Sequence, residues 1–444
     1  MQFHRAILTR KPAVARVLLL VFAFTAWSIT GPANVALALL CALFLTEIPG
    51  HWAQLRREPA FLLLLGVLIL TSLLALRGAW LFPATATDQW QAISAWVAPL
   101  LFIVPAWWLR RDPDQVWPLL GAAALGLALG VMRKGDWSLL PQILEGMRYH
   151  FGFAALGLAF IASVILMGLV LFRRRVTGLR ICGRPRPLLG WAIWLAGLGC
   201  LLAVLVVTQS RGAALILALA GVLYGVIQWR AHHPRGERVG PGRRLRLLAS
   251  VTLVVAMGAL LLWATKQRQL DDWHELTLGG QGAELSYRGP TSIRLNLHQV
   301  GLAAFAQRPL LGFGPGTSTT EFLVPQGLVP VSPYHREHAP HASHLHSLAL
   351  EILARFGLVG VAIALILGWV LARAYRRLWT DDRAPPDLRA FLTIGGVMLV
   401  FFCLYDFRVM NLDLRFFCIL FLGVLYCFNL GTAAAAEAKG TGDD

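Results

Sequence analysis

Long runs of apolar residues recur along most of the chain, and short polar or basic segments separate them. The runs fall near residues 13–30, 33–48, 60–76, 92–108, 116–132, 150–172, 188–208, 212–228, 247–264, 346–372, 390–406 and 411–430. Each is close to the roughly 20 residues that an α-helix needs to cross a bilayer. The pattern predicts an all-α polytopic membrane protein with about twelve transmembrane helices.

Composition excludes a soluble protein, because 57% of the residues are hydrophobic and only 14% are charged. The formal net charge is +17, from 40 Lys and Arg against 23 Asp and Glu. Most basic residues stand between apolar runs, so we expect membrane lipids, and no nucleic acid, as their partners. Of the six cysteines, all but Cys182 lie in apolar runs, which predicts neither a disulfide framework nor a metal motif.

Alternate loops differ strongly in charge, and Lys and Arg are retained on the cytoplasmic side of a membrane. We therefore predict a multi-pass membrane protein with both termini in the cytoplasm and an N-terminal segment kept as a signal anchor. The expected organisation is a cytoplasmic N-terminus (1–12), helices 1–9 (13–264), an outward-facing loop domain (265–345), helices 10–12 (346–430) and a disordered cytoplasmic tail (431–444).

The large predicted loop, residues 265–345, contains one candidate helix. The break at Gly289-Pro290 and a cap at Thr291 or Ser292 predict a helix to about Gln307, before Arg308-Pro309. One apolar face gives an amphipathic helix suited to a membrane surface, formed by Ile293, Leu297, Val300 and Ala304. Arg294 and His298, four residues apart, can face a common cleft.

A glycine-rich stretch and a histidine-rich stretch follow this helix. Gly312, Gly314, Pro315 and Gly316 predict a tight turn, with a phosphate cradle as the less favoured alternative. Residues 334–346, beginning with Tyr334, hold five of the chain's 12 histidines. Three interpretations remain open for them: a general base beside a phosphate site, a metal site, or a polar interfacial loop.

His346 is the preferred general base, because the apolar helix that follows fixes it at the membrane boundary, and His344 is the second choice. Arg211, Arg288 and Arg294 are all predicted on the outer face, where positive charge is normally depleted. Arginines there favour an anionic ligand, since a guanidinium binds phosphate in a bidentate manner. The alternative is that they snorkel to lipid phosphates.

These segments carry a resemblance to a known family. Three segments resemble the conserved region of the O-antigen ligase and Wzy-type polymerase superfamily. They are Ser210-Arg211-Gly212-Ala213, the segment from Arg294 to Gly316, and the segment from His346 to Gly357 with Gly360. The resemblance covers roughly residues 190–430. It implies a GT-C-like glycosyltransferase of the bacterial inner membrane that takes a glycan from undecaprenyl diphosphate on the periplasmic face. The loop domain 265–345 would then be periplasmic.

In a ligase, the acceptor would be a sugar of lipid A-core. The resemblance assigns catalysis to His346, Arg211 and Arg294, without a metal or cofactor, and inversion at the anomeric carbon. We expect Arg211, Arg288, Arg294, His298, Tyr334 and His344 to bind diphosphate or acceptor, and the protein to be a monomer. The chain departs from the family pattern at two places. It has His346-Ser347 in place of His-Asn, which leaves His344 as an alternative base. It has Leu297-His298 in place of an aromatic residue, which leaves Arg288 as a substitute for Arg294.

Other functions remain open at this stage. A Wzy-type polymerase would add the glycan to another lipid-linked glycan, and a protein O-oligosaccharyltransferase would add it to Ser or Thr. A membrane transporter is the alternative that is not an enzyme. The polar residues gather at one predicted face, beside one large loop, which is unlike the paired broken helices of carriers.

Overall fold

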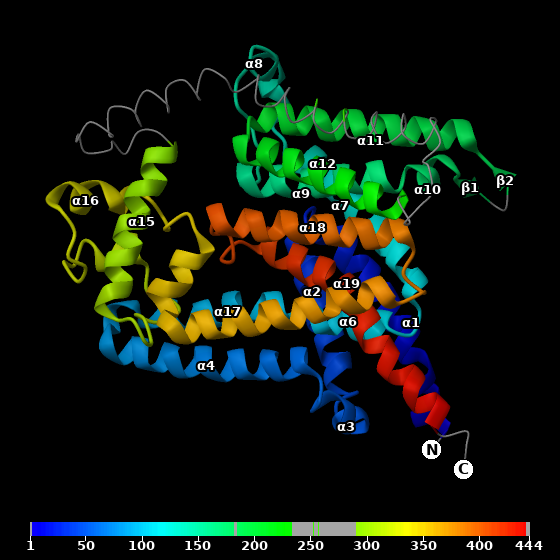
Figure 1. Ribbon diagram of the computed structural model, residues 1–444, viewed down its shortest axis with the longest axis horizontal. Helices are drawn as coiled ribbons and strands as arrows, with labels where there is room; N and C mark the ends of the chain where they lie inside the picture. Colours follow the sequence, from blue (N-terminus) through cyan, green and yellow to red (C-terminus); the bar gives the residue numbers. More distant parts are fainter. Residues whose placement is uncertain (1, 182–183, 233–251, 253–255, 257–289, 441–444) are drawn as a thin grey trace. The chain divides into compact units, whose positions relative to one another are not determined.

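The computed structural model describes residues 2–181, 184–232, 252, 256 and 290–440 (Figure 1). These residues belong to two units. The first unit combines residues 1–130, 271–383 and 403–444, and the second combines residues 131–270 and 384–402. Within the described residues, the only strands are β1 (Arg180–Ile181) and β2 (Arg184–Pro185), a short antiparallel pair in the second unit. The predicted all-α class is confirmed.

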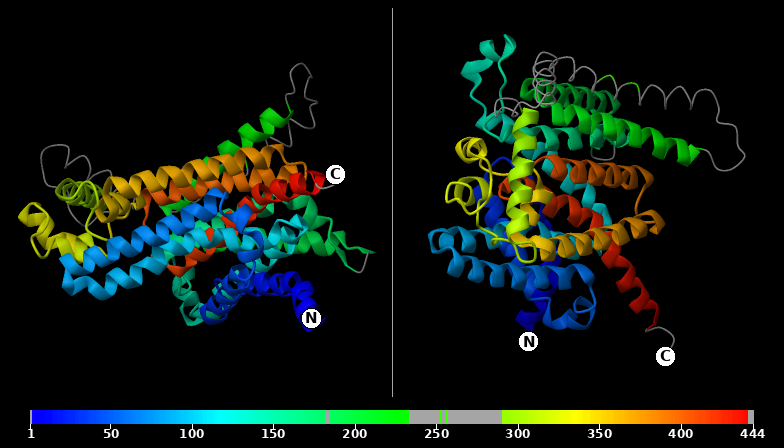
Figure 2. Two further views of the ribbon diagram at one scale, coloured as in Figure 1. Left: turned by 90° about the horizontal axis from the view of Figure 1, so that it is seen from below. Right: turned by 60° about the vertical axis from the view of Figure 1, so that its left-hand side comes forward.

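The first unit is built on α19 (Leu412–Gly440), whose apolar part, Leu412–Leu430, is 83% buried. This helix packs against α6 (Ile103–Leu109) and α17 (Leu348–Thr380). α4 (Pro59–Leu81) and α5 (Ala86–Val97) lie side by side (Figure 2). The first unit also contains α1 (Gln2–Thr25), α2 (Thr30–Leu45), α3 (Trp52–Leu55), most of α7 (Val116–Lys134), α15 (Pro290–Gln307) and α16 (Pro333–His338).

α17 is broken near its start, at Gly357, where the backbone has φ 61° and ψ −150°. A Cβ atom on Gly357 would lie 2.5 Å from the Pro309 carbonyl oxygen, so only glycine fits there. Just after the break, the Leu358 N–H donates to that same oxygen at 2.8 Å. On the other side of the contact, a Cβ on Gly312 would lie 2.3 Å from the carbonyl carbon of Arg355. The glycine-rich turn and the start of α17 therefore pack backbone against backbone.

The second unit surrounds α9 (Ala155–Leu171), which is largely buried and contacts α11 (Pro187–Thr208) and α12 (Arg211–His232). It also contains α8 (Leu140–Leu144), α10 (Arg173–Thr177) and most of α18 (Pro386–Tyr405). Phe160 of α9 stacks on Phe402 of α18 with ring centroids 4.4 Å apart. The Arg175 Nε atom lies 2.6 Å from the Asp387 carboxylate, which ties α10 to the start of α18.

The predicted apolar runs within the described residues coincide with helices, whereas the run 247–264 lies almost wholly outside them. Eight described helices are long and apolar enough to cross a membrane, or nine if Thr30–Leu45 and Pro49–Leu55 form one bent span. The chain is therefore an integral membrane protein. The count of about twelve is not confirmed, partly because α9, with 17 residues, is shorter than a typical span.

The predicted helix of the large loop is confirmed as α15, which ends at Gln307. Its predicted role at a membrane surface is wrong, because its apolar face is covered by the protein. Leu297, Val300 and Ala304 have no exposed surface, and they share a core with Leu345 and Leu350. An amphipathic pattern predicts a buried face but does not specify whether lipid or protein covers it.

The predicted disordered tail is helical in its first part, since α19 continues to Gly440. Residues 431–440 are rich in alanine, the strongest helix former, so the helix extends beyond its apolar part. Residues 441–444 lie outside the described part of the chain.

Candidate active site

His346 lies between η7 (Ala339–His341) and α17, in a left-handed backbone conformation with φ 52°. For a residue other than glycine this conformation costs roughly 1 kcal/mol or more, and such strain often marks functional sites. The Nδ1 atom of His346 lies 3.4 Å from Oδ1 of Asp406, in the segment between α18 and α19. The His346 side chain is 25% exposed and that of Asp406 is fully buried. The ring is thus backed by a buried carboxylate and open on another side.

Asp406 is held as an anion by several donors. Its Oδ1 accepts from the Phe407 N–H at 3.0 Å, and its Oδ2 accepts from Arg408 Nε at 2.8 Å. Burial raises the pKa of this carboxyl, but the hydrogen bond from His346 and the charge of Arg408 outweigh burial and hold the pKa below its usual range. An ionised Asp406 favours the His346 tautomer with a proton on Nδ1, so that Nε2 can accept a proton.

His344 stands next to His346, with ring centroids 4.3 Å apart in an edge-to-face arrangement. Its Nδ1 accepts a hydrogen bond from the His346 backbone N–H at 3.2 Å. Burial, followed by the positive charge of His346, lowers the pKa of His344 to about 4. His344 is therefore neutral near pH 7 and a weak base, which favours His346 for proton abstraction.

His344, His346 and Asp406 are also the one group of side chains in the described part of the chain that could bind a metal ion. Ligand atoms of His344, His346 and Asp406 lie within 4.8 Å of one another. Both oxygens of Asp406 already accept hydrogen bonds, however, and the Arg408 guanidinium beside them repels a second cation. The donor set thus fits a hydrogen-bonded His–Asp pair better than a zinc site, which needs free ligand atoms.

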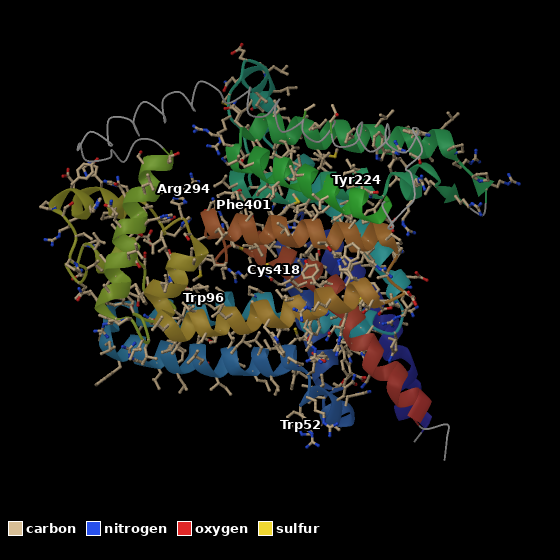
Figure 3. The ribbon with its side chains drawn as sticks, in the orientation of Figure 1. Trp52, Trp96, Tyr224, Arg294, Phe401 and Cys418 are labelled. Carbon is tan, nitrogen blue, oxygen red and sulfur yellow. The ribbon has the colours of Figure 1, made fainter. Side chains whose placement is uncertain are left out.

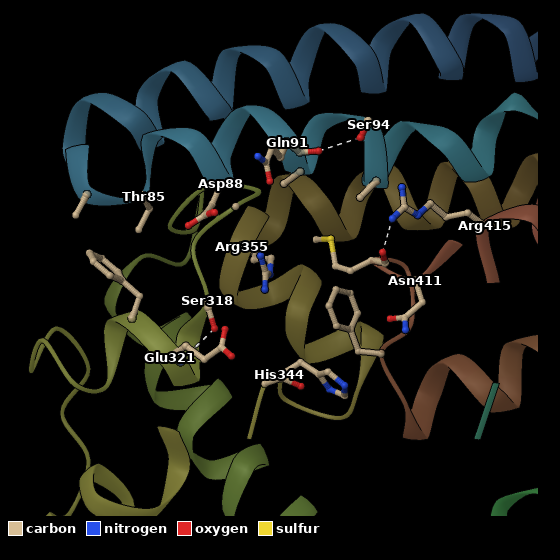
Figure 4. A pocket seen from close by; sticks show the side chains of 18 residues that line it. Thr85, Asp88, Gln91, Ser94, Ser318, Glu321, His344, Arg355, Asn411 and Arg415 are labelled. Atoms are coloured by element: carbon tan, nitrogen blue, oxygen red, sulfur yellow. Dashed lines mark hydrogen bonds between the residues drawn. The ribbon is translucent and has the colours of Figure 1, made fainter. Parts of the chain in front are cut away.

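A cavity of about 880 Å³ opens in the first unit beside this cluster (Figure 4). The wall carries both acidic groups, Asp88 and Glu321, and basic groups, Arg355 and Arg415. A lining that mixes carboxylates, guanidiniums and hydroxyls suits a ligand with many hydroxyl groups better than an apolar one. Its polar side chains include Thr85, Asp88, Gln91, Ser94, Ser318, Glu321, His344, Arg355, Asn411 and Arg415.

An ion pair at the start of α17 connects the histidine segment to the cavity wall. Glu351 Oε1 accepts from the Leu345 backbone N–H at 2.8 Å, and Glu351 Oε2 accepts from Arg355 Nε at 2.5 Å. Arg355 in turn donates to the Pro315 carbonyl at 2.7 Å. Both side chains are almost fully buried. This chain of contacts fixes the backbone between His344 and His346 against the glycine-rich turn.

The glycine-rich turn serves the structure, and the alternative of a phosphate cradle is not supported. Its backbone N–H groups already have protein acceptors. Gln89 of α5 holds the turn from the other side, because its Oε1 accepts from Gly316 and its Nε2 donates to the Thr317 hydroxyl. The acceptors for Gly312, Phe313 and Gly314 are the carbonyls of Arg308, Ala354 and Arg355, respectively.

Arg294 and His298 lie on α15, one turn apart, and Arg294 is half-buried (Figure 3). Burial and the charge of Arg294 together lower the pKa of His298, which keeps that imidazole neutral near pH 7. The Nε2 atom of His298 is buried without a hydrogen-bond partner among the described residues. Arg294 is also close enough to the Tyr405 hydroxyl for its charge to act there, beside Asp406.

Arg211 is the first residue of α12, in the second unit. Ser210 caps this helix by accepting a hydrogen bond from the Ala213 N–H at 3.3 Å, and Gln209 ends α11 in a left-handed conformation with φ 47°. Its predicted role beside His346 stays a prediction. Arg288 lies outside the described residues.

The earlier part of the histidine-rich stretch forms α16. Tyr334 packs its ring against His338 with centroids 4.4 Å apart, and its carbonyl oxygen is 2.9 Å from His338 Nδ1. His335 Nε2 lies 3.0 Å from Gln299 Oε1 of α15. These contacts give Tyr334, a predicted substrate-binding residue, a visible structural role.

Sequence reasoning missed the acidic side of the site. Asp406 lies in the short polar segment between two apolar runs. Asp88 lies in the first turn of α5, just before an apolar run that is typical of a membrane span. An acidic residue at the edge of an apolar run is the signal that could have identified both, because carboxylates are rare and usually functional near membrane segments. Arg415, a basic residue of the cavity wall, was missed as well, although a charged residue inside the last apolar run also indicates function.

The central part of the chain resembles a known protein family. Residues 195–365 match the model of a family described as O-antigen ligase. The matched segment contains Arg211, Arg294 and His346, and Asp406 follows it. No curated protein matches the chain.

Proposed function

Because the chain belongs to the O-antigen ligase superfamily, we propose that it transfers O-antigen polysaccharide from undecaprenyl diphosphate to a sugar hydroxyl of lipid A-core. The family match supports a ligase- or polymerase-type activity in lipopolysaccharide biosynthesis, carried out by a membrane protein. The observation that carries the more specific proposal is the His346–Asp406 pair beside a polar cavity.

In the proposed mechanism, His346 removes the proton from the acceptor hydroxyl, and Asp406 stabilises the imidazolium that forms. The acceptor oxygen then attacks the anomeric carbon of the donor, the bond from that carbon to the diphosphate oxygen breaks, and the diphosphate leaves. Attack from the face opposite the leaving group inverts the configuration. No metal or other cofactor takes part.

Arginines would stabilise the departing diphosphate, whose negative charge grows as the bond breaks. Arg294 is the best placed of the described candidates, since it is half-buried and its charge acts beside Asp406. Arg211 and Arg288 are assigned to the same task from the family resemblance. The active site would face the periplasm, as the charge pattern of the loops predicts.

The direct test is transfer in vitro, with purified protein, glycan-loaded undecaprenyl diphosphate and lipid A-core. A glycan attached to lipid A-core would support the ligase. Longer lipid-linked glycan without that product would identify a polymerase, and an absence of both products would overturn the proposal. Activity that survives EDTA is expected, and its loss would favour the metal interpretation of His344, His346 and Asp406.

The arginine roles need their own variants. Arg294→Ala should reduce turnover by roughly 100-fold or more, as expected for loss of one group that stabilises developing charge. Arg211→Ala should act similarly. Arg336→Ala is the matched control, because Arg336 is an exposed arginine on α16. Equal activity of Arg294→Ala and the control would remove Arg294 from the mechanism.

A further inference from the structure

Two arginines of the first unit, neither of which lines the cavity, approach the glycine-rich turn. Arg77 lies near the end of α4, and its Nη1 donates to the Gly312 carbonyl at 3.0 Å. Arg308 follows α15, and its guanidinium carbon lies 5.2 Å from the ring centroids of both Phe82 and Phe313. Gly312 and Phe313 are neighbours, so the two guanidiniums approach the same part of the turn.

The described residues provide no carboxylate for either cation, because no ion pair involves Arg77 or Arg308. The two charges are close enough that the charge of Arg308 acts on the Arg77 guanidinium. Like charges held together by fixed contacts repel each other, and the repulsion is strongest where water is scarce. An anion bound between them would remove that cost and gain charge-assisted hydrogen bonds.

The surroundings identify where that anion comes from. Trp80 is 80% exposed, Leu310 is 66% exposed, and Leu311 is also exposed, so an apolar surface adjoins the two arginines. Arg77 precedes the end of α4, at Leu81, by four residues, or about 6 Å at a rise of about 1.5 Å per residue. In a helix that spans a bilayer, a residue so close to the helix end lies at the depth of the lipid head groups. Exposed tryptophan is enriched at the same depth.

We propose that Arg77 and Arg308 form a binding site for the phosphate of an anionic glycerophospholipid, with its acyl chains against Trp80, Leu310 and Leu311. Ordinary snorkelling would leave each arginine free to follow passing lipids. Here Gly312 fixes one guanidinium and two aromatic rings confine the other. Both cations are therefore positioned before the lipid arrives, which lowers the entropy cost of binding.

The site has a consequence for the neighbouring cavity. Arg77 binds Gly312 in the same turn whose Pro315 carbonyl accepts from Arg355 at the cavity wall. A lipid held by Arg77 and Arg308 would thus stabilise the turn that supports the His344 to His346 segment. This role does not depend on which reaction the cavity performs.

The test is native mass spectrometry of the full chain in detergent, titrated with phosphatidylglycerol, with phosphatidylcholine, or with inorganic phosphate. The wild-type protein should retain phosphatidylglycerol at least about tenfold more tightly than phosphatidylcholine. Arg308→Gln should weaken phosphatidylglycerol binding about tenfold, and Arg77→Gln with Arg308→Gln should abolish the preference. Arg308→Lys, which keeps the charge, should retain part of it.

Arg336→Gln, on exposed α16, is the matched control and should bind like the wild type. Because Arg308→Gln removes no hydrogen bond of the turn, it separates lipid binding from any folding defect of the double variant. Equal retention of phosphatidylglycerol by the wild type and Arg308→Gln would overturn the proposal. Displacement of the lipid by millimolar inorganic phosphate would also overturn it, since the apolar contacts should make the lipid bind more tightly. Neither outcome depends on glycosyl transfer, so the result is independent of the proposed function.

Discussion

Four of the five histidines of the segment 335–346 fall into two pairs with different environments. His335 and His338 belong to α16, and their ring nitrogens lie near the polar groups of Gln299 and Tyr334. His344 and His346 stand before α17, in contact with each other and with the buried Asp406. The contacts described for the first group are with neutral polar groups, whereas the second group contacts an ionised carboxylate.

The difference shows that a histidine-rich sequence does not by itself form a chemical site. A neutral amide or carbonyl orients an imidazole but does little to stabilise its protonated form, whereas an adjacent carboxylate does both. Asp406 is 60 residues from His346 in the chain, and the fold brings them within 3.4 Å. Four predictions test the comparison, beginning with the largest expected effect.

The largest effect should come from His346→Ala. Loss of a general base typically lowers turnover by about 10²- to 10⁴-fold, and the product should fall accordingly in the in vitro transfer assay. His338→Ala, from the other group, should stay within about twofold of the wild type, because it lies outside the proposed chemistry. If the two variants have the same activity, the distinction between the groups has no catalytic meaning.

Asp406→Asn should reduce turnover by about 10- to 100-fold, as expected for a residue that orients and stabilises a catalytic histidine. The substitution keeps the shape but removes the charge that stabilises the imidazolium in the proposed mechanism. Turnover in the transfer assay, measured together with thermal unfolding, provides the test. A loss of turnover no larger than the loss of folded protein would show that Asp406 serves only the fold.

The scaffold of the second group can be perturbed without touching a histidine. Gly357→Ala should destabilise the protein by about 1–3 kcal/mol, because the new Cβ would meet Pro309 and φ is positive. Gly368→Ala in the same helix has open space around its Cβ and should be neutral or stabilising by about 0.5–1 kcal/mol. Thermal unfolding in detergent measures both. Equal effects would mean that the break in α17 is not needed.

The smallest effect concerns stability against pH. Burial holds the pKa of His344 at about 4 in the folded protein, whereas the unfolded chain has the ordinary histidine pKa of 6.5. Between these values the unfolded state binds more protons, so stability falls as the pH falls from 6.5 to 4. His344→Gln should flatten this part of the profile and leave stability at neutral pH nearly unchanged. If the stability of the wild type and of His344→Gln falls equally steeply between pH 6.5 and 4, then His344 is not buried as described.

Much of the site could be read from local sequence because its residues follow local rules. The ends of α15 were predicted to within a residue or two. The prediction used the break at Gly289-Pro290, the potential caps and the stop at Arg308-Pro309. The histidines and Arg294 stood out because charged and titratable residues are few in so apolar a chain. The spans were also visible, although their total was not confirmed, since hydropathy does not tell a crossing helix from one that is too short.

Pairing over long distances could not be read in this way. The face of α15 formed by Leu297, Val300 and Ala304 fits lipid and protein equally well by pattern, and only the folded chain covers it with α17. The same holds for Gln89, which binds the glycine-rich turn from a helix more than 200 residues earlier in the sequence. Hydrogen-bond partners of this kind depend on geometry in three dimensions.

The sequence by itself determined that the chain is an all-α membrane protein, where its helices lie, and which family its central region resembles. These features depend on apolar length, caps and short motifs, each of which is encoded within a few neighbouring residues. The tertiary structure decided that His346 stands against Asp406, that His344 is buried and neutral, and that Arg77 and Arg308 meet at one turn. Electrostatic interactions act through space and depend on burial, so the charges that matter to a side chain can be far from it in the chain.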